Sequence, residues 1–171
     1  MSNDFGTEDY DLNRIIVRPL YFSMVANITV PMILLFGCYM INNRFGGVRD
    51  KLGTAGDMLL YVLAAIALAE AVYAIWWRGK LFAAPMIRSK ESFQEDFSNE
   101  YLRRCRPLFL LIASMSLYGY LFYFLTGRFN EAVMFVVFSF LVFQAVRPRY
   151  GLVRKLIERQ RALVDKGQFL V

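Results

Sequence analysis

The chain has 171 residues, of which 57% are hydrophobic and 20% are charged, and its formal net charge is +6. The charges fall in blocks between long apolar runs, which is typical of a membrane protein and excludes an ordinary soluble domain. The basic excess therefore indicates membrane topology and anionic lipid headgroups as partners, and no nucleic acid. Histidine is absent and there are only two cysteines, so we expect no cofactor and no metal site.

The first nineteen residues are expected to form an acidic N-terminal segment that ends at an Arg-Pro pair. Its acidity is the opposite of a signal peptide's basic start, so the apolar run that follows, 20–41, is interpreted as a retained span. This span holds Asn27 and Pro31. A proline at position 31 leaves the carbonyl of residue 27 without its helical partner and predicts a kink. The kink is either a hinge with a polar site or a bend of the kind that membrane helices tolerate.

The second span, 58–77, is about one bilayer crossing long and contains a single carboxylate, Glu70. Ala67 and Ala71 are four residues apart and predict close helix packing on the face that Glu70 adjoins. Trp76 and Trp77 at the end of the span indicate a membrane interface.

The segment 78–106 is polar and is expected to form a short amphipathic helix between two membrane hairpins. Phe93, Phe97 and Tyr101 recur every four residues and are followed by Arg103 and Arg104. This pattern predicts an aromatic stripe and a basic end that dock on lipid headgroups or on a partner protein.

A second hairpin is predicted over 107–146, with spans at 108–126 and 132–146. The last span is short, so it starts at the headgroups, thins the bilayer or extends beyond its apolar run. The tail, 147–171, has the spacing of a basic amphipathic helix. Arg18-Pro19-Leu20 before span one and Arg106-Pro107-Leu108 before span three suggest that the hairpins 20–77 and 107–146 arose by duplication of a unit that covers about 15–78 and 103–147. The expected fold is all-α, with four transmembrane helices and interfacial amphipathic helices.

Basic residues are distributed unequally between the two predicted sides of the membrane. Of the 20 Lys and Arg residues, 16 lie in the N-terminal segment, in 78–106 and in the tail. The positive-inside rule therefore predicts that both termini and 78–106 are cytoplasmic. We expect a bacterial cytoplasmic (inner) membrane, with the mitochondrial inner membrane as the open alternative.

Glu70 is the strongest candidate for chemistry, because an acid inside a span is costly unless it is neutral, paired or functional. One hypothesis is a proton carrier, with Asn27 as a second polar group in the membrane. The other is a structural acid that is hydrogen-bonded to Asn27, Ser114 or Ser116. The motif Ala69-Glu70-Ala71 in an alanine-rich helix resembles the proteolipid c-subunits of rotary ATPases, which implies ion translocation. That family's glycine-rich first helix is missing here, since span one contains only Gly37.

The sequence offers no catalytic constellation, so we expect that the protein is not an enzyme. Histidine is absent, and no two carboxylates share a predicted membrane face. The favoured hypothesis is a non-catalytic accessory or scaffold subunit of a membrane complex that binds other subunits. The alternatives are a proton- or ion-translocating subunit that uses Glu70 and a small carrier that handles lipid or quinone.

Overall fold

The computed structural model describes residues 12–170, and within this range the chain is helical without any strand. The elements are α1 (Leu12–Met24), the π-helix η1 (Val25–Thr29), α2 (Val30–Arg44), α3 (Ala55–Leu81), α4 (Phe93–Thr126), α5 (Phe129–Val146) and α6 (Tyr150–Asp165). Four stretches are long and apolar enough to cross a membrane: Ile15–Arg44, Ala55–Leu81, Phe93–Thr126 and Phe129–Val146. The predicted all-α fold with four spans is therefore confirmed. Residues 1–11 of the predicted acidic segment lie outside the described residues.

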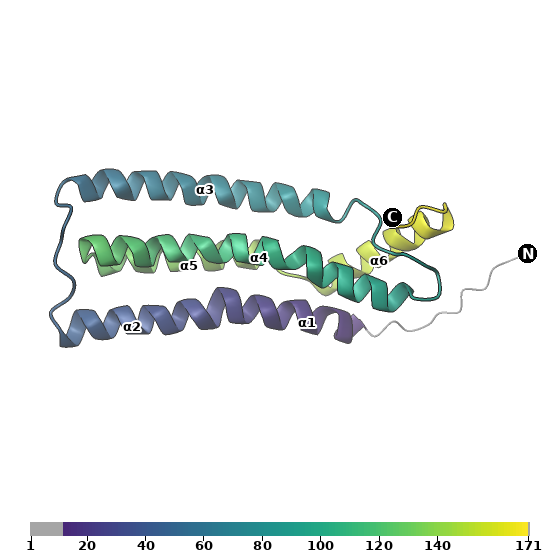
Figure 1. The fold of residues 1–171 in the computed structure, drawn as a ribbon, viewed down its shortest axis with the longest axis horizontal. Helices are drawn as coiled ribbons and strands as arrows, with labels where there is room; N and C mark the ends of the chain where they lie inside the picture. Colours follow the sequence, from purple (N-terminus) through teal and green to yellow (C-terminus); the bar gives the residue numbers. More distant parts are fainter. Residues whose placement is uncertain (1–11, 171) are drawn as a thin grey trace, which may run out of the picture.

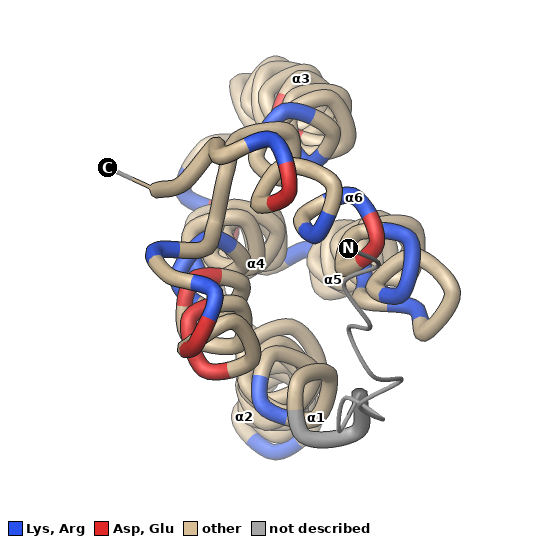
Figure 2. Tube along the Cα trace, turned by 90° about the vertical axis from the view of Figure 1, so that its right-hand side faces the viewer, with Lys and Arg blue, Asp and Glu red and all other residues tan. Residues whose placement is uncertain are grey.

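The four spans form a bundle with α4 and α5 in its centre (Figures 1 and 2). The continuous rod of α1, η1 and α2 packs on one side of this pair, and α3 packs on the other. Among the described residues, no Cα atom of α3 lies within 8 Å of a Cα atom in α1, η1 or α2. The segment 20–77 is thus two successive helices without a mutual contact, whereas α4 and α5 pack directly on each other. The two predicted hairpins differ in packing, which does not favour the duplication.

The α4–α5 contact is close because a glycine lies in it. A Cβ atom at Gly119 would be 2.8 Å from the carbonyl oxygen of Ala132 and 2.9 Å from Cβ of Phe135. Ser139 Oγ of α5 donates a hydrogen bond of 2.8 Å to the carbonyl oxygen of Ile112 in α4. Buried hydroxyls that bond to a neighbouring helix fix its rotation where water is absent.

The rod of α1, η1 and α2 is irregular at the position that Pro31 predicts. The π-helix η1 ends two residues before Pro31, which occupies the first turn of α2. Proline has no N–H to donate, and the wider π turn accommodates the interrupted hydrogen-bond ladder. Two tyrosines of α4 donate to carbonyl oxygens of α2: Tyr120 to Pro31, and Tyr123 to Cys38 at 3.1 Å. These bonds hold the rod against α4.

The helix is not interrupted at residue 107, where the sequence predicted a boundary between two segments. Pro107 lies inside α4, whose 34 residues run without interruption from the predicted surface helix into the third span. The fourth span begins at Phe129, three residues before the predicted start, and its 18 residues extend about 27 Å. The helix therefore extends beyond its apolar run, as one of the three alternatives predicts.

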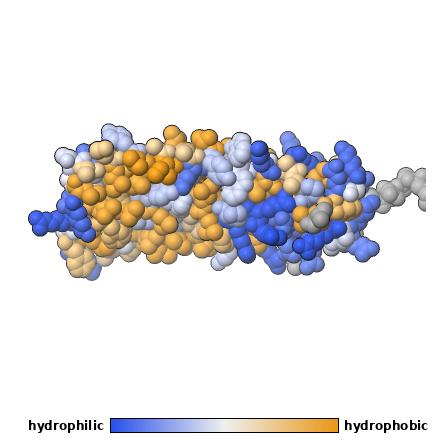
Figure 3. Space-filling view, turned by 45° about the horizontal axis from the view of Figure 1, so that its top comes forward, coloured by the Kyte–Doolittle hydropathy of each residue, from blue (hydrophilic) through white to orange (hydrophobic). Residues whose placement is uncertain are grey.

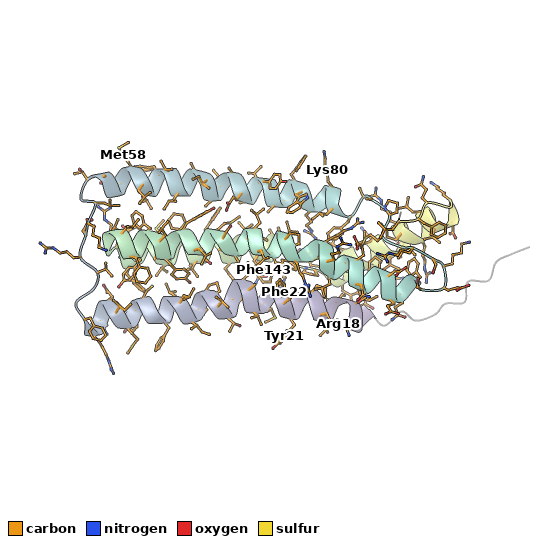
Figure 4. All side chains as sticks on the ribbon, viewed as in Figure 1. Arg18, Tyr21, Phe22, Met58, Lys80 and Phe143 are labelled. Carbon is orange, nitrogen blue, oxygen red and sulfur yellow. The ribbon has the colours of Figure 1, made fainter. Side chains whose placement is uncertain are left out.

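Polar residues concentrate at one end of the bundle. This end contains the start of α1, the linker 82–92, the first turns of α4, and α6 (Figure 1). The loop 45–54 lies at the other end. Figure 2 looks onto this end and shows Lys and Arg there together with Asp and Glu, and Figure 3 shows mostly apolar surface on the visible face between this end and the opposite tip. In Figure 4, Tyr21 points away from the bundle and Phe22 points toward α4, where Arg106 lies 5.8 Å from its ring. We call the end of the bundle that contains the start of α1, the linker 82–92, the first turns of α4, and α6 the polar end.

The glycine contact gives a first prediction. Gly119→Ala should destabilise the protein by about 1–3 kcal/mol, because the added methyl group meets backbone atoms of α5 that have no room to move. Thermal unfolding of the detergent-solubilised protein, followed by size-exclusion chromatography, measures the change. Gly37→Ala is the matched control, since a Cβ atom at Gly37 meets nothing within 4 Å. Equal stability of the two variants would contradict the close α4–α5 contact.

Candidate functional site

Glu70 of α3 contacts two hydroxyl side chains of α4. Tyr118 donates its hydroxyl proton to Glu70 Oε1 at 2.5 Å, and Ser114 Oγ lies 3.2 Å from Glu70 Oε2. Ser114 and Tyr118 are four residues apart, so both face α3 from the same side of α4. Of the three predicted partners of Glu70, Ser114 is the one found, and Tyr118 is a partner that the sequence reasoning missed.

The hydroxyl of Ser114 has a single proton and two candidate acceptors. The carbonyl oxygen of Leu111 lies 2.6 Å away, closer than Glu70 Oε2. The Ser114 hydroxyl can donate to only one of these two oxygens at a time, whereas Tyr118 donates to Glu70 Oε1 alone.

This cluster lies within the apolar part of the spans and at the edge of the bundle. Glu70 is eight residues from Arg78 on one helix, which corresponds to about 12 Å along the axis. Glu70, Ser114 and Tyr118 are each only partly buried. The exposed side chains around them are apolar: Ile66, Tyr73, Leu117 and Leu121. The seam between α3 and α4 therefore presents a carboxyl group next to a lipid-facing surface.

Asn27 lies on the other side of the central pair and does not join this cluster. It belongs to η1, which packs on α4 and α5 and makes no contact with α3. Its side chain is 2% exposed, and its Nδ2 donates to the carbonyl oxygen of Ser23 at 3.1 Å. Its Oδ1 has no hydrogen-bond partner among the described residues. The predicted pairing of Asn27 with Glu70 is thus not present.

The other predicted residues of α3 lie on two different faces. Ala67 and Ala71 are buried on the face toward the central pair. Trp76 is exposed, and Lys80 Nζ lies 4.3 Å from the centre of its ring. Trp77 stacks on Tyr73 with ring centres 5.6 Å apart. Met58 and Lys80 mark the two ends of α3 in Figure 4.

The aromatic stripe is placed differently from the expectation of a surface that docks lipid or a partner. Phe93, Phe97 and Tyr101 are all buried within the protein, and Phe97 is fully inaccessible. Their rings stack along α4, with centres 6.3 Å and 5.8 Å apart. The stripe packs into the core of the polar end, because the linker and α6 fold back over it. An amphipathic pattern looks the same whether lipid or protein covers it.

Arg103 and Arg104 have opposite surroundings despite being neighbours. The Arg103 side chain is 76% exposed and lies 3.6 Å from Glu100. The Arg104 side chain is 13% exposed and pairs with Glu100 at 2.8 Å. It also donates to the carbonyl oxygens of Leu81 at 2.7 Å, of Ala84 at 3.3 Å and of Pro85 at 2.8 Å. Arg104 therefore binds the carboxyl end of α3 to α4 and is not free to dock a partner.

The tail helix α6 also packs on the protein. Val153, Ile157 and Val164 are buried, and α6 contacts α1. The fully buried Gln160 accepts from the N–H of Met86 at 3.0 Å and donates to the carbonyl oxygen of Ala84 at 3.1 Å. The apolar side of α6 thus meets the linker and α1, where the sequence favoured the membrane surface.

Comparison with known proteins gives no assignment. No protein-family model, no curated protein and no solved structure matches the chain. Among residues 12–170, no group of three or more His, Cys, Asp or Glu side chains is placed to hold a metal ion. The candidate site is therefore defined by the seam cluster of Glu70, Ser114 and Tyr118.

The largely buried Arg104 gives a stability prediction. Arg104→Ala should cost about 3–5 kcal/mol, because it breaks the short ion pair with Glu100 and leaves the carbonyl oxygens of Leu81 and Pro85 without their donor. Arg103→Ala should change stability by less than about 0.5 kcal/mol, since this side chain is exposed. Thermal unfolding in detergent compares the two variants. Similar melting temperatures for both would show that Arg104 does not hold the end of α3.

Proposed function

We propose that the protein is a non-catalytic accessory or scaffold subunit of a multi-subunit membrane complex, and that Glu70 contacts a transmembrane helix of a partner subunit. The observation that carries this proposal is the partly exposed carboxyl group of Glu70 at the seam between α3 and α4. A polar group at this depth is costly when it faces lipid.

The free hydrogen-bonding capacity of the cluster supports a partner. The two oxygens of a carboxyl group offer several acceptor sites, and Ser114 and Tyr118 use two of them. Lipid tails can satisfy none of the remainder. A partner helix laid over the seam would supply a polar side chain and would cover the apolar residues Ile66 and Leu117 beside it.

The mode of attachment of α3 also favours this function. The buried positions of α3 in the membrane are mostly alanine, so this helix makes few large apolar contacts within its own chain. Its outer surface is rich in large exposed side chains, among them Tyr61, Leu68, Val72 and Ile75. Such a surface suits packing against further membrane helices as well as lipid.

Proton or ion translocation through Glu70 is the second candidate, favoured by the exchangeable proton that the cluster would hold. Within the described residues, the interior of the bundle contains fully buried apolar side chains such as Ile112, Met115 and Phe122. A proton path would therefore require polar groups from a partner. The third candidate, a carrier of lipid or quinone, is supported by a groove at the polar end that is described below.

We further propose that the protein resides in a bacterial cytoplasmic membrane with the polar end in the cytoplasm. The support is the positive-inside rule applied to the basic residues gathered at that end (Figure 2). The mitochondrial inner membrane, with the polar end in the matrix, is the alternative.

Purification from the native membrane in a mild detergent tests the subunit proposal. We expect the chain to co-purify with other membrane proteins at constant stoichiometry. Glu70→Leu should weaken their retention by about threefold to eighteenfold, because an interhelical hydrogen bond in a membrane contributes about 0.6–1.7 kcal/mol. Glu91→Gln is the control, since Glu91 is an exposed residue of the linker.

The outcomes separate the candidates. A wild-type protein that elutes without stoichiometric partners would overturn the subunit proposal. If Glu70→Gln stops proton flux while the complex stays intact, translocation replaces the scaffold role. If the complex falls apart in Glu70→Leu and no proton flux is found in wild type, the carboxyl group serves assembly.

A further inference from the structure

A groove of about 410 Å³ lies between α3, α4 and α6, at the junction of the membrane spans and the polar end. This volume is within the range of about 300–1,000 Å³ that is common for ligand sites. Its apolar wall includes Ile75 of α3 and Leu108 and Phe109 of α4. Its rim includes Arg78 of α3 and Lys155 and Arg159 of α6.

The positive charges of the rim are not neutralised by any carboxylate that lines the groove. No carboxylate is among the residues that line the groove. Lys155 and Arg159 are one turn apart on α6, so two positive charges face the same side and repel each other. Neither forms an ion pair with the described residues, whereas their neighbour Arg154 pairs with Glu158 at 3.4 Å.

Arg78 is positioned at this rim by the end of another helix. Its Nη1 donates a hydrogen bond of 3.0 Å to the carbonyl oxygen of Ala145, in the last turn of α5. A guanidinium has five N–H groups, so donors remain for an anion. Trp76 and Trp77 directly precede Arg78, which places the rim at the headgroup level and Ile75 at the edge of the hydrocarbon.

We propose that this groove binds one anionic phospholipid, with its phosphate at Arg78, Lys155 and Arg159 and an acyl chain along Ile75 and Phe109. The arrangement complements both parts of such a molecule: positive charge at the level of the headgroup and an apolar wall directly beneath it. A free phosphate ion would use the rim and leave the apolar wall uncovered. This site is separate from Glu70, and its test does not depend on the subunit proposal.

Native mass spectrometry of the full-length, delipidated protein in mild detergent tests the site by titration with phosphatidylglycerol and with phosphatidylcholine. We expect at least about tenfold tighter binding of phosphatidylglycerol. Lys155→Gln with Arg159→Gln should weaken that binding by about fivefold for each lost cation, the change that corresponds to about 1 kcal/mol per basic residue near anionic lipid.

Arg154→Gln with Lys166→Gln is the control, because it removes the same charge from the same part of the chain outside the groove. Equal losses in the two double variants would show diffuse attraction to anionic lipid and overturn the site. Equal binding of the two lipids by wild type would do the same. If phosphatidylglycerol binds no more tightly than inorganic phosphate, the apolar wall contributes nothing, the groove is a phosphate site and the lipid assignment is wrong.

Discussion

The close contact between α4 and α5 at Gly119 is the constraint on which the arrangement of the membrane helices depends. Lipid is as apolar as leucine, so burial of apolar area contributes little to helix association, and short-range packing with hydrogen bonds must provide it. At Gly119 the backbone of Ala132 comes so near that no side chain fits between the helices. The resulting pair is the layer on which α3 packs from one side and the α1–η1–α2 rod from the other (Figure 2).

Each neighbour of α4 is also fixed by hydroxyl groups. Ser139 of α5 bonds to a carbonyl of α4, and Tyr120 and Tyr123 of α4 bond to carbonyls of α2. Ser114 and Tyr118 meet the carboxyl group of Glu70 in α3. These contacts set the rotation of each helix about its axis, a property that apolar packing alone specifies poorly. At the polar end a side chain also bonds to backbone carbonyls of another segment. There Arg104 of α4 donates to three carbonyl oxygens at and just after the end of α3.

The sequence predicts the four spans because each needs only a local property, an apolar run of sufficient length. It also predicts the irregularity before Pro31, since the missing N–H acts within one turn. It does not predict which helices touch. The roles of Arg104 and Tyr118 depend on residues 19 to 48 positions away, and no local pattern encodes those pairings. The stripe of Phe93, Phe97 and Tyr101 was recognised as one face of a helix, but periodicity gives no information on what covers a face.

The contact of α3 with α4 differs in kind from the contacts of α2 and α5 with α4. The tyrosine and serine bonds of α2 and α5 end on backbone carbonyls, whose hydrogen-bonding capacity is constant. The bond network of α3 ends on a carboxyl group that can gain or lose a proton, and the surrounding buried positions are mostly alanine. Among these three contacts, the α3 contact is therefore the one that ends on an ionisable side chain. Because the seam opens to the membrane, a neighbouring helix can reach that carboxyl group without disturbing the α4–α5 pair. Under the proposed subunit function, α3 is therefore the side of the bundle on which a partner helix would pack.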